Sequence, residues 1–198
     1  MFVLHRVIIE GEKPMIFNNP SDICDFYINQ ILKDGDCAVD ATAGNGHDTL
    51  KLSNAIGEAG KVYAFDIQQN AIDSAKSQNY IYNNTEFILA SHSDIDKYVS
   101  AAPKLIIFNL GYLPGGDHSM CTKSDTTIEA ISKSMDLIPP EGVIILVIYS
   151  GGDTGFDEKE SVLNFVKNIN HKKFNTLFFD YINRPNNPPS VCVIQKKK

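Results

Sequence analysis

The stretch 39–48, VDATAGNGHD, constrains the fold of this chain more than any other. An apolar run ends in Asp40, a turn containing Gly44 and Gly46 follows, and residues typical of a helix start come next. Glycine lets the backbone turn tightly and approach a ligand where a Cβ would intrude. A second apolar run ends at Asp66 about twenty positions later, where a carboxylate can accept both hydroxyl protons of a ribose. This spacing predicts the first βα unit of a nucleotide-binding sheet.

The residues around the glycine turn separate three kinds of ligand. A dinucleotide fingerprint needs a third glycine where this chain has Thr49, and no Gly-Lys-Ser/Thr of a phosphate loop occurs. Acids at both strand ends, Asp40 and Asp66, favour a cationic ligand and would repel a pyrophosphate. S-adenosylmethionine (SAM), with its sulfonium and ammonium groups, is therefore the favoured cofactor. NAD, and a glycine turn that binds nothing, remain the alternatives.

Composition predicts one globular domain with a hydrophobic core. The chain has 198 residues, of which 43% are hydrophobic. We expect a divergent segment over residues 1–20 and a single domain over 21–198. No apolar run is long enough for a membrane span, and the N-terminus lacks a signal-peptide pattern. The cysteines have no paired spacing, which predicts reduced thiols in a cytoplasm and no metal site; they are Cys24, Cys37, Cys121 and Cys192.

Alternating strands and helices predict an α/β fold with a mostly parallel, seven-stranded sheet and helices on both faces. Ser21 and Asp22 are expected to cap the first helix, which runs to about Leu32. The predicted strands are 37–39, 62–65, 86–90, 105–108, 143–149, 175–179 and 191–195, the last two as a hairpin-like pair. The other predicted helices are 48–56, 71–79, 126–137 and 160–170. Ligands of such sheets lie beyond the carboxyl ends of the strands.

The expected cofactor contacts are the residues of the glycine turn and of these strand ends. They are Asp40, Thr42, Gly44, Asn45, Gly46, Asp48, Thr49, Asp66, Gln68, Ser91, His92 and Asn109. For His92, a structural role in the core is an equally good interpretation.

The loop that leaves the fourth strand, NLGYLPGGDH over residues 109–118, is the candidate acceptor site. The side-chain carbonyl of Asn109 can accept a hydrogen bond from an amine and orient its lone pair toward a methyl group. Tyr112 can stack on a base or close the pocket. An aliphatic amine must lose a proton before transfer, and Asp117 and His118 are the candidate proton acceptors. Asn109 through Tyr112 resembles the Asn-Pro-Pro-Tyr loop of amino-directed methyltransferases, although a plain turn has the same composition.

Several motifs in one order resemble a bacterial family of rRNA methylases. They comprise DATAGNGHDT from Asp40, FDIQ from Phe65, NLGYLPGGDHS from Asn109, DTT from Asp125, VIY from Val147 and NRPNNPP from Asn183. The similarity covers nearly everything after about residue 22. The family includes a tRNA methyltransferase that converts wobble 5-aminomethyl-2-thiouridine to its methylaminomethyl form.

The resemblance implies a Rossmann-like class I methyltransferase fold, SAM as methyl donor and the anticodon loop of tRNA as substrate. Carried over by position, Asp40, Gly44, Gly46 and Asp66 would hold the cofactor, and the loop from Asn109 to His118 would face the acceptor. One departure follows Tyr149, where the family tends to have Gly-His and this chain has Gly151, Gly152 and Asp153. Residues 1–20 match no pattern of the family.

The net charge of −6 does not favour a nucleic-acid partner, but its distribution is uneven. From Lys167 onward there are seven lysines and arginines against Asp180, so this segment carries +6 and the remainder −12. The basic segment, Lys123, Lys133 and Lys159 are candidates for an RNA-binding rim, with Arg184 as a phosphate or base contact. A homodimer that combines two modest patches is a second solution, and an ordinary solvated tail is a third.

The favoured function is thus N-methylation of the aminomethyl group of wobble uridine in tRNA. A methyltransferase of the same fold that acts on rRNA or on a small amine is the first alternative. An NAD-linked oxidoreductase is disfavoured by Thr49, and a module that binds SAM or RNA without catalysis is disfavoured by the acceptor loop.

Overall fold

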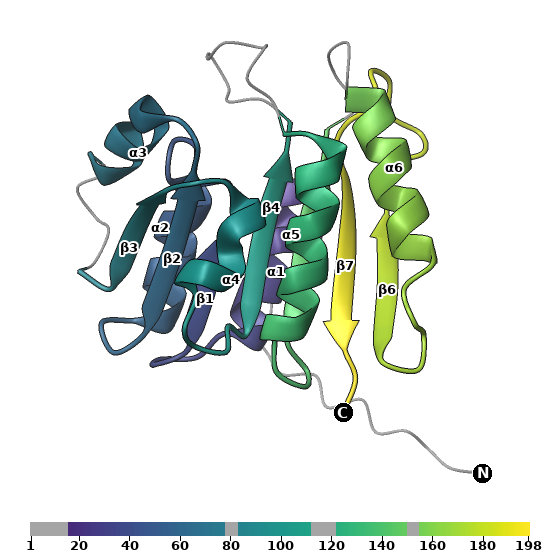
Figure 1. The fold of residues 1–198 in the computed structure, drawn as a ribbon. Coiled ribbons are helices and arrows are strands. Elements are labelled where there is room, and N and C mark those ends of the chain that lie inside the picture. The colour runs from purple at the N-terminus through teal and green to yellow at the C-terminus, as the bar shows by residue number, and fades with distance from the viewer. Residues whose placement is uncertain (1–15, 78–82, 112–121, 150–154) are drawn as a thin grey trace, which may run out of the picture.

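The structure is a computed structural model, and it describes residues 16–77, 83–111, 122–149 and 155–198. Seven strands form one sheet in the order β3-β2-β1-β4-β5-β7-β6 (Figure 1). The first five strands of that order pair in parallel, whereas β7 is antiparallel to both of its neighbours. The strands are β1 Cys37–Asp40, β2 Lys61–Asp66, β3 Thr85–Leu89, β4 Leu105–Leu110, β5 Val143–Ile148, β6 Phe174–Phe179 and β7 Ser190–Lys196.

Helices cover both faces of the sheet (Figure 1). Apolar side chains of α1 and α2 pack on one face, and those of α4, α5 and α6 pack on the other. Every residue of β5 is buried, as expected for a central strand with helices on both sides. The helices are α1 Pro20–Ile31, α2 His47–Ile56, α3 Gln69–Lys76, α4 Ile95–Tyr98, α5 Ser124–Leu137 and α6 Gly155–Lys167, with a 3₁₀ turn η1 at His92–Asp94.

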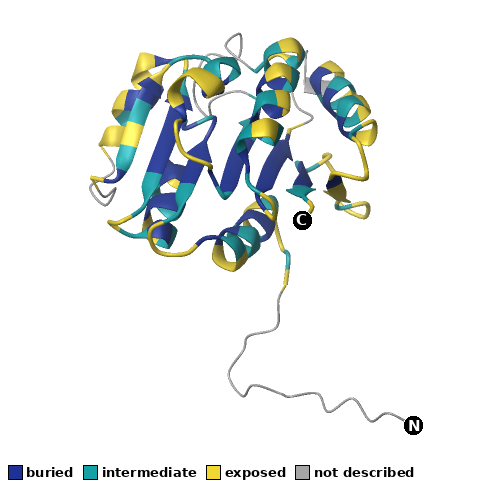
Figure 2. Ribbon diagram, turned by 60° about the horizontal axis from the view of Figure 1, so that its bottom comes forward, coloured by how far each residue is buried: buried dark blue, intermediate teal, exposed yellow. Residues whose placement is uncertain are grey.

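Burial is concentrated in the centre of the sheet (Figure 2). The edge strand β6 is different, because only its first residue, Phe174, is buried. The parallel strands end at one common edge of the sheet, with Asp40 beside Ile107 and Leu110 beside Ile148 in the register. The strand order reverses between β1 and β4, and that reversal places a ligand crevice at this edge. We call it the site edge.

The predicted α/β sheet is confirmed, including all seven strands and the antiparallel pairing of β6 with β7. Ser21 and Asp22 were predicted to cap the first helix, and of these only Asp22 takes part in the cap. Asn19 is the N-cap and accepts from the Asp22 backbone, while the Asp22 carboxylate accepts from the Asn19 backbone in return. Neither η1 nor α4 was predicted, and α6 begins at Gly155, five residues before its predicted start. In the described residues, no helix is long and apolar enough to cross a membrane.

Candidate active site

The glycine turn between β1 and α2 has a backbone that favours glycine. Gly44 and Gly46 have φ angles of 51° and 82°, in the left-handed region. A Cβ on Gly46 would come within 2.9 Å of Ala75 in α3, so the turn also packs too closely for a side chain. The Gly46 N–H closes the turn by donating to the Ala43 carbonyl at 2.8 Å. The turn therefore brings bare backbone to the site edge, where a ligand can approach closely.

Asp40 organises the glycine turn from beneath. Its side chain is fully buried, and it accepts hydrogen bonds from the Thr49 hydroxyl at 2.6 Å and from the Thr42 backbone at 3.1 Å. Burial, followed by the charge of Asp48, raises the pKa of Asp40 to about 7, although the bonds from Thr49 and Thr42 act in the opposite direction. Asp40 and Thr49 were predicted as cofactor contacts, but neither has exposed surface with which to touch a ligand. Their role in this structure is to shape the turn.

Asp66 lies at the tip of β2, beside the glycine turn. Its Oδ2 accepts from the Gly44 backbone and its Oδ1 from the Gln68 backbone, each at 2.9 Å. Each oxygen retains a further lone pair, so the carboxylate can accept two ribose hydroxyls without losing these bonds. The side-chain oxygen of Gln68 is buried and has no hydrogen-bond partner in the described residues. An orphaned acceptor of this kind, next to Asp66, fits a ligand that brings its own donor.

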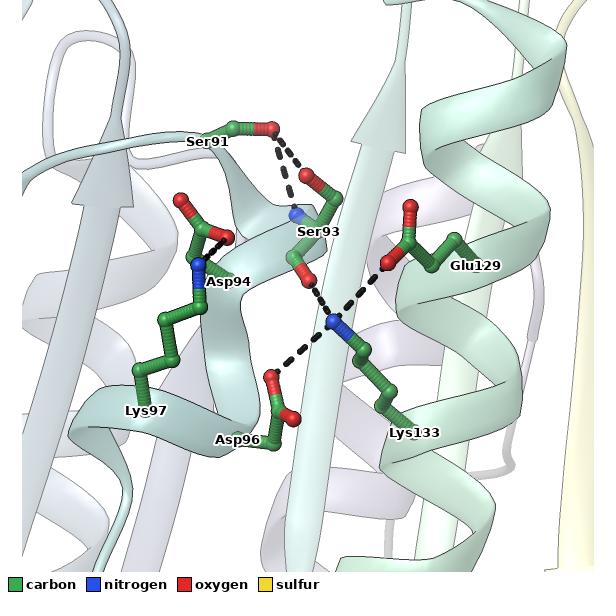
Figure 3. A network of polar contacts seen from close by, with 7 residues as sticks. All are labelled: Ser91, Ser93, Asp94, Asp96, Lys97, Glu129 and Lys133. Atoms are coloured by element: carbon green, nitrogen blue, oxygen red, sulfur yellow. Dashed lines mark hydrogen bonds and ion pairs between the residues drawn. The ribbon is translucent and has the colours of Figure 1, made fainter.

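The loop after β3 is fixed to α5 by a network of polar contacts (Figure 3). Ser91 Oγ accepts from the Ser93 backbone at 3.2 Å. Lys133 of α5 donates to the Ser93 carbonyl at 2.6 Å and pairs with Asp96 at 3.1 Å and Glu129 at 2.9 Å. Lys133 was predicted as a rim cation for RNA. Its charge is instead balanced by two carboxylates, and it holds the loop that carries Ser91.

His92 belongs to the core rather than to the surface of this loop. It is 8% exposed, and its ring packs edge-on against Phe108 with centroids 5.7 Å apart. Burial lowers its pKa to about 4, with a hydrogen bond to the Ala41 backbone acting in the opposite direction. Its Nε2 is buried and has no partner in the described residues. These contacts favour the structural interpretation of His92, as a neutral side chain that supports the ends of β1 and β4.

Asn109 at the end of β4 is held by two polar contacts. Its backbone N–H donates to Thr42 Oγ1 at 2.7 Å, and its side-chain Nδ2 donates to Asp48 Oδ2 at 2.9 Å. Because a carboxylate only accepts, Asp48 fixes the amide so that its nitrogen faces the acid, and among the described residues its oxygen, Oδ1, has no hydrogen-bond partner. The orientation of the predicted acceptor carbonyl is thus set by a neighbour on α2.

Lys51 in turn anchors Asp48, and Lys51 was not predicted as a site residue. Its Nζ lies 3.2 Å from Asp48 Oδ1, 2.8 Å from Asp25 Oδ1 and 2.6 Å from Ser21 Oγ. Burial acts to lower the pKa of Lys51, but the hydrogen bonds and charges of Asp25 and Asp48 outweigh it and raise the pKa. Lys51 therefore remains a cation and connects the first turns of α1 and α2.

A cavity of about 820 Å³ opens between these elements, within the size range of small-molecule sites. Of the predicted cofactor residues, Thr42, Gly44, Asn45, Asp48 and Asn109 line it. The remaining wall comes from the start of α1, from α2 and from the ends of β4, β5 and the β6–β7 connection: Asn19, Pro20, Ser21, Cys24, Ala43, His47, Lys51, Gly111, Val147, Tyr149 and Pro189. The participation of α1 was not predicted, since nothing local in its sequence marks it as part of a site.

The base of the acceptor loop is tied together by a buried carboxylate. Gly111 and Thr122 exchange two hydrogen bonds, Gly111 N to Thr122 Oγ1 at 2.9 Å and Thr122 N to the Gly111 carbonyl at 3.0 Å. Glu158 of α6, 6% exposed, accepts from the hydroxyls of Thr122 at 2.6 Å and Thr127 at 2.8 Å. Three predicted catalytic residues, Tyr112, Asp117 and His118, lie outside the described residues, as do Gly151, Gly152 and Asp153. Glu158 was not predicted.

The basic C-terminal segment does not gather at the site edge. Because β6 and β7 are antiparallel, Phe174 pairs with Lys196 at the far edge, and the chain reaches the site edge only between Phe179 and Ser190. Of the seven cations from Lys167 onward, Arg184 alone lies at the site edge. The prediction of a rim is therefore wrong for the other six, which are Lys167, Lys172, Lys173, Lys196, Lys197 and Lys198.

Among the described residues, no group of three or more His, Cys, Asp or Glu is arranged to hold a metal ion.

The parallel sheet with its reversal at β1 and β4, the glycine turn and Asp66 together define a class I methyltransferase with a Rossmann-like fold. Residues 62–195 match the family described as "Putative rRNA methylase". This chain belongs to that family.

Three relatives carry the similarity. A "putative rRNA-methylase" from Clostridium thermocellum is 45% identical, with a TM-score of 0.88 over 91% of this chain and 99% of that chain. A "putative methyltransferase" from Streptococcus mutans, in complex with SAH, is 35% identical, with a TM-score of 0.83 over 91% of this chain and 99% of that chain. The chloroplastic tRNA (mnm(5)s(2)U34)-methyltransferase of Arabidopsis thaliana is 35% identical over 85% of this chain. The alignment spans 66% of the plant protein's length.

Proposed function

We propose that this methyltransferase uses SAM to methylate the aminomethyl nitrogen of wobble 5-aminomethyl-2-thiouridine in tRNA. The observation that carries the proposal is the position of Asn109, whose carbonyl oxygen is left available beside the glycine turn while its amide nitrogen is held by Asp48 at 2.9 Å. A carbonyl fixed in this way can accept a hydrogen bond from an amine and hold it in one orientation.

The residues of the crevice fit SAM. The glycine turn provides a close backbone approach, Asp66 has free lone pairs for two ribose hydroxyls, and the orphaned Gln68 oxygen can accept from an adenine amino group. The acids near the turn suit a cation, because a positive charge beside Asp48 and Asp66 is favoured electrostatically. The Streptococcus mutans relative in complex with SAH supports the same cofactor.

When bound, SAM supplies an electrophilic methyl group, and the residues of this chain place the acceptor. Asn109 Oδ1 would accept from the amine N–H, which directs the nitrogen lone pair away from the amide. Asp48 and Lys51 prevent the amide from rotating, because rotation would bring Oδ1 against the Asp48 carboxylate. Holding the acceptor in one orientation contributes to rate by reducing the entropy lost on reaching the transition state.

The acidic surroundings create a requirement for a proton acceptor. Negative charge at Asp48 stabilises a protonated amine, yet the nitrogen needs a free lone pair to accept the methyl group. Asp117 and His118, predicted from sequence, remain our candidates for removing that proton. Tyr112 remains the candidate for stacking on the base.

The assignment of tRNA rather than another acceptor is supported by the plant relative, which is named for the wobble position. The family description refers to rRNA, so ribosomal RNA is the acceptor to test in parallel. A cytoplasmic location belongs to the same proposal, and it is supported by the free thiols of Cys24, Cys37 and Cys192.

The test is transfer of label from methyl-tritiated SAM to bulk tRNA that lacks the terminal methyl group, with rRNA and the free aminomethyl nucleoside as parallel acceptors. We expect label in tRNA alone, in a nucleoside that digestion identifies as methylaminomethyl-thiouridine. Label only in rRNA, or only in the free nucleoside, would contradict the tRNA assignment while leaving the cofactor and the fold in place.

A further inference from the structure

The connection between β6 and β7 forms part of the rim of the cavity. Residues 180–189 join Phe179 to Ser190 at the site edge, and Pro189 lines the cavity itself. Arg184 of this connection donates to the carbonyl of Asn18, immediately before the first turn of α1. That turn also lines the cavity, through Asn19, Pro20 and Ser21. Arg184 therefore lies beside the cavity mouth, although it is far from the glycine turn in sequence.

Arg184 is a cation that remains open to a partner. Its guanidinium lies over the ring of Tyr181, 4.4 Å from the centroid, and the residue is exposed. Within the described residues it forms no ion pair, whereas Lys51 and Lys133 are each paired with two carboxylates. A guanidinium has five N–H donors, and the hydrogen bond to the Asn18 carbonyl uses Nη1 alone. The stacked face orients the group while leaving edge donors for an anion.

The neighbours of Arg184 indicate the kind of anion. Ile182 is 94% exposed and Tyr181 is partly buried beneath the guanidinium, so apolar and aromatic surface adjoins the charge. Single-stranded RNA loops present both phosphates and splayed bases, which bind to such mixed surfaces. A duplex would present its phosphates but not the faces of its bases. Prolines at 185, 188 and 189 reduce the freedom of the connection, and this lowers the entropy cost of binding.

We propose that the Tyr181–Arg184 turn is the docking point for an RNA loop, with Arg184 bound to a backbone phosphate next to the nucleotide that enters the cavity. This inference rests on the proposed function, and it explains how the acidic protein holds an anion at the site edge. Ile182 supplies apolar contact to a neighbouring base, and the Tyr181 ring keeps the guanidinium in place.

The test is the equilibrium binding of a fluorescent anticodon-arm hairpin at several salt concentrations, together with SAM affinity by calorimetry. We expect Arg184→Ala to weaken hairpin binding about tenfold and to reduce the salt slope by about one. SAM affinity should stay unchanged. Lys172→Ala, an exposed cation before β6 at the far edge, is the matched control and should bind like the wild type.

Three results would overturn the docking point. One is unchanged hairpin affinity for Arg184→Ala, and another is an equal loss for Lys172→Ala, which would indicate non-specific attraction. The third is a parallel loss of SAM affinity in Arg184→Ala, which would assign Arg184 to holding the start of α1. If the wild type methylates tRNA in these cases, only the docking point fails. If the wild type neither binds nor methylates RNA, the proposed function fails and the docking point falls with it.

Discussion

The buried carboxylate of Asp40 makes the stability of the protein depend on pH in a predictable direction. Burial and the neighbouring charge of Asp48 raise its pKa from 3.8 to about 7. Between these two values the folded chain keeps a proton that the unfolded chain has released. The contribution of Asp40 to the free energy of unfolding is therefore complete below about pH 4, and it decreases as the pH rises toward 7. Replacement by asparagine, Asp40→Asn, removes the titration while keeping the size of the side chain.

The size of the effect follows from the two pKa values. Linkage between 3.8 and about 7 gives a loss of about 2–3 kcal/mol in the free energy of unfolding between pH 5 and pH 8. The hydrogen bonds from Thr49 and Thr42 favour the ionised form, and the pKa of about 7 already includes their opposing effect. Between pH 5 and pH 8 the free energy of unfolding should therefore fall less in Asp40→Asn than in the wild type, by about 2–3 kcal/mol.

The assay is urea unfolding of the cofactor-free protein at pH 5 and pH 8, followed by circular dichroism. Asp136→Asn, at an exposed position of α5, removes a carboxylate without altering the turn and should follow the wild type. If Asp40→Asn shows the same pH dependence as the wild type, Asp40 is ionised throughout in the folded chain, and the reasoning from burial is refuted.

Three further substitutions separate the parts of the site. Asp66→Ala removes the acceptor of two ribose hydroxyls and should weaken SAM binding about 10²–10⁴-fold by calorimetry, with the exposed Asp73→Ala of α3 unaffected; unchanged affinity would contradict the ribose assignment. Asn109→Ala should leave SAM affinity within about twofold and reduce methyl transfer at least about a hundredfold, so normal turnover would remove its acceptor role. Glu158→Gln should raise the tRNA KM or lower kcat by about tenfold while SAM affinity stays constant. If the exposed Glu160→Gln has an equal effect, the loss comes from helix α6 as a whole and not from the Glu158 carboxylate.

Most of the fold was predictable because its signals are local. The predicted strand 143–149 is apolar throughout, as a strand buried on both faces must be, and its residues 143–148 form β5. The helix cap was misplaced because residues 18–22 offer several capping side chains in a row. Pro20 was the deciding signal, since proline favours the first position of a helix and leaves Asn19 as the cap. The four-residue helix α4 was missed because it is too short to show a helical period.

The glycine turn and Asp66 were located from sequence, whereas the residues that act through space were not. Lys51 reaches Ser21 across 30 positions, and Glu158 reaches Thr122 across 36. No local pattern marks such contacts, because they exist only after α1, α2 and α6 have packed. The position of the basic tail was predictable from the hairpin already expected. Because β6 and β7 are antiparallel, the start of β6 and the end of β7 lie at the same edge of the sheet, opposite the edge where the parallel strands end.

The charge distribution explains how one acidic chain can serve two ligands of opposite sign. A sulfonium cofactor is favoured beside Asp48 and Asp66, and the negative field of these two carboxylates would also repel an RNA phosphate brought into the crevice. Screening limits this repulsion to about 8–10 Å at physiological salt, so a phosphate can bind at the rim while a neutral base enters the cavity. Arg184 occupies such a rim position. A nucleotide would thus bind with its base inward, which brings the substituent of the base, and not the backbone, to Asn109.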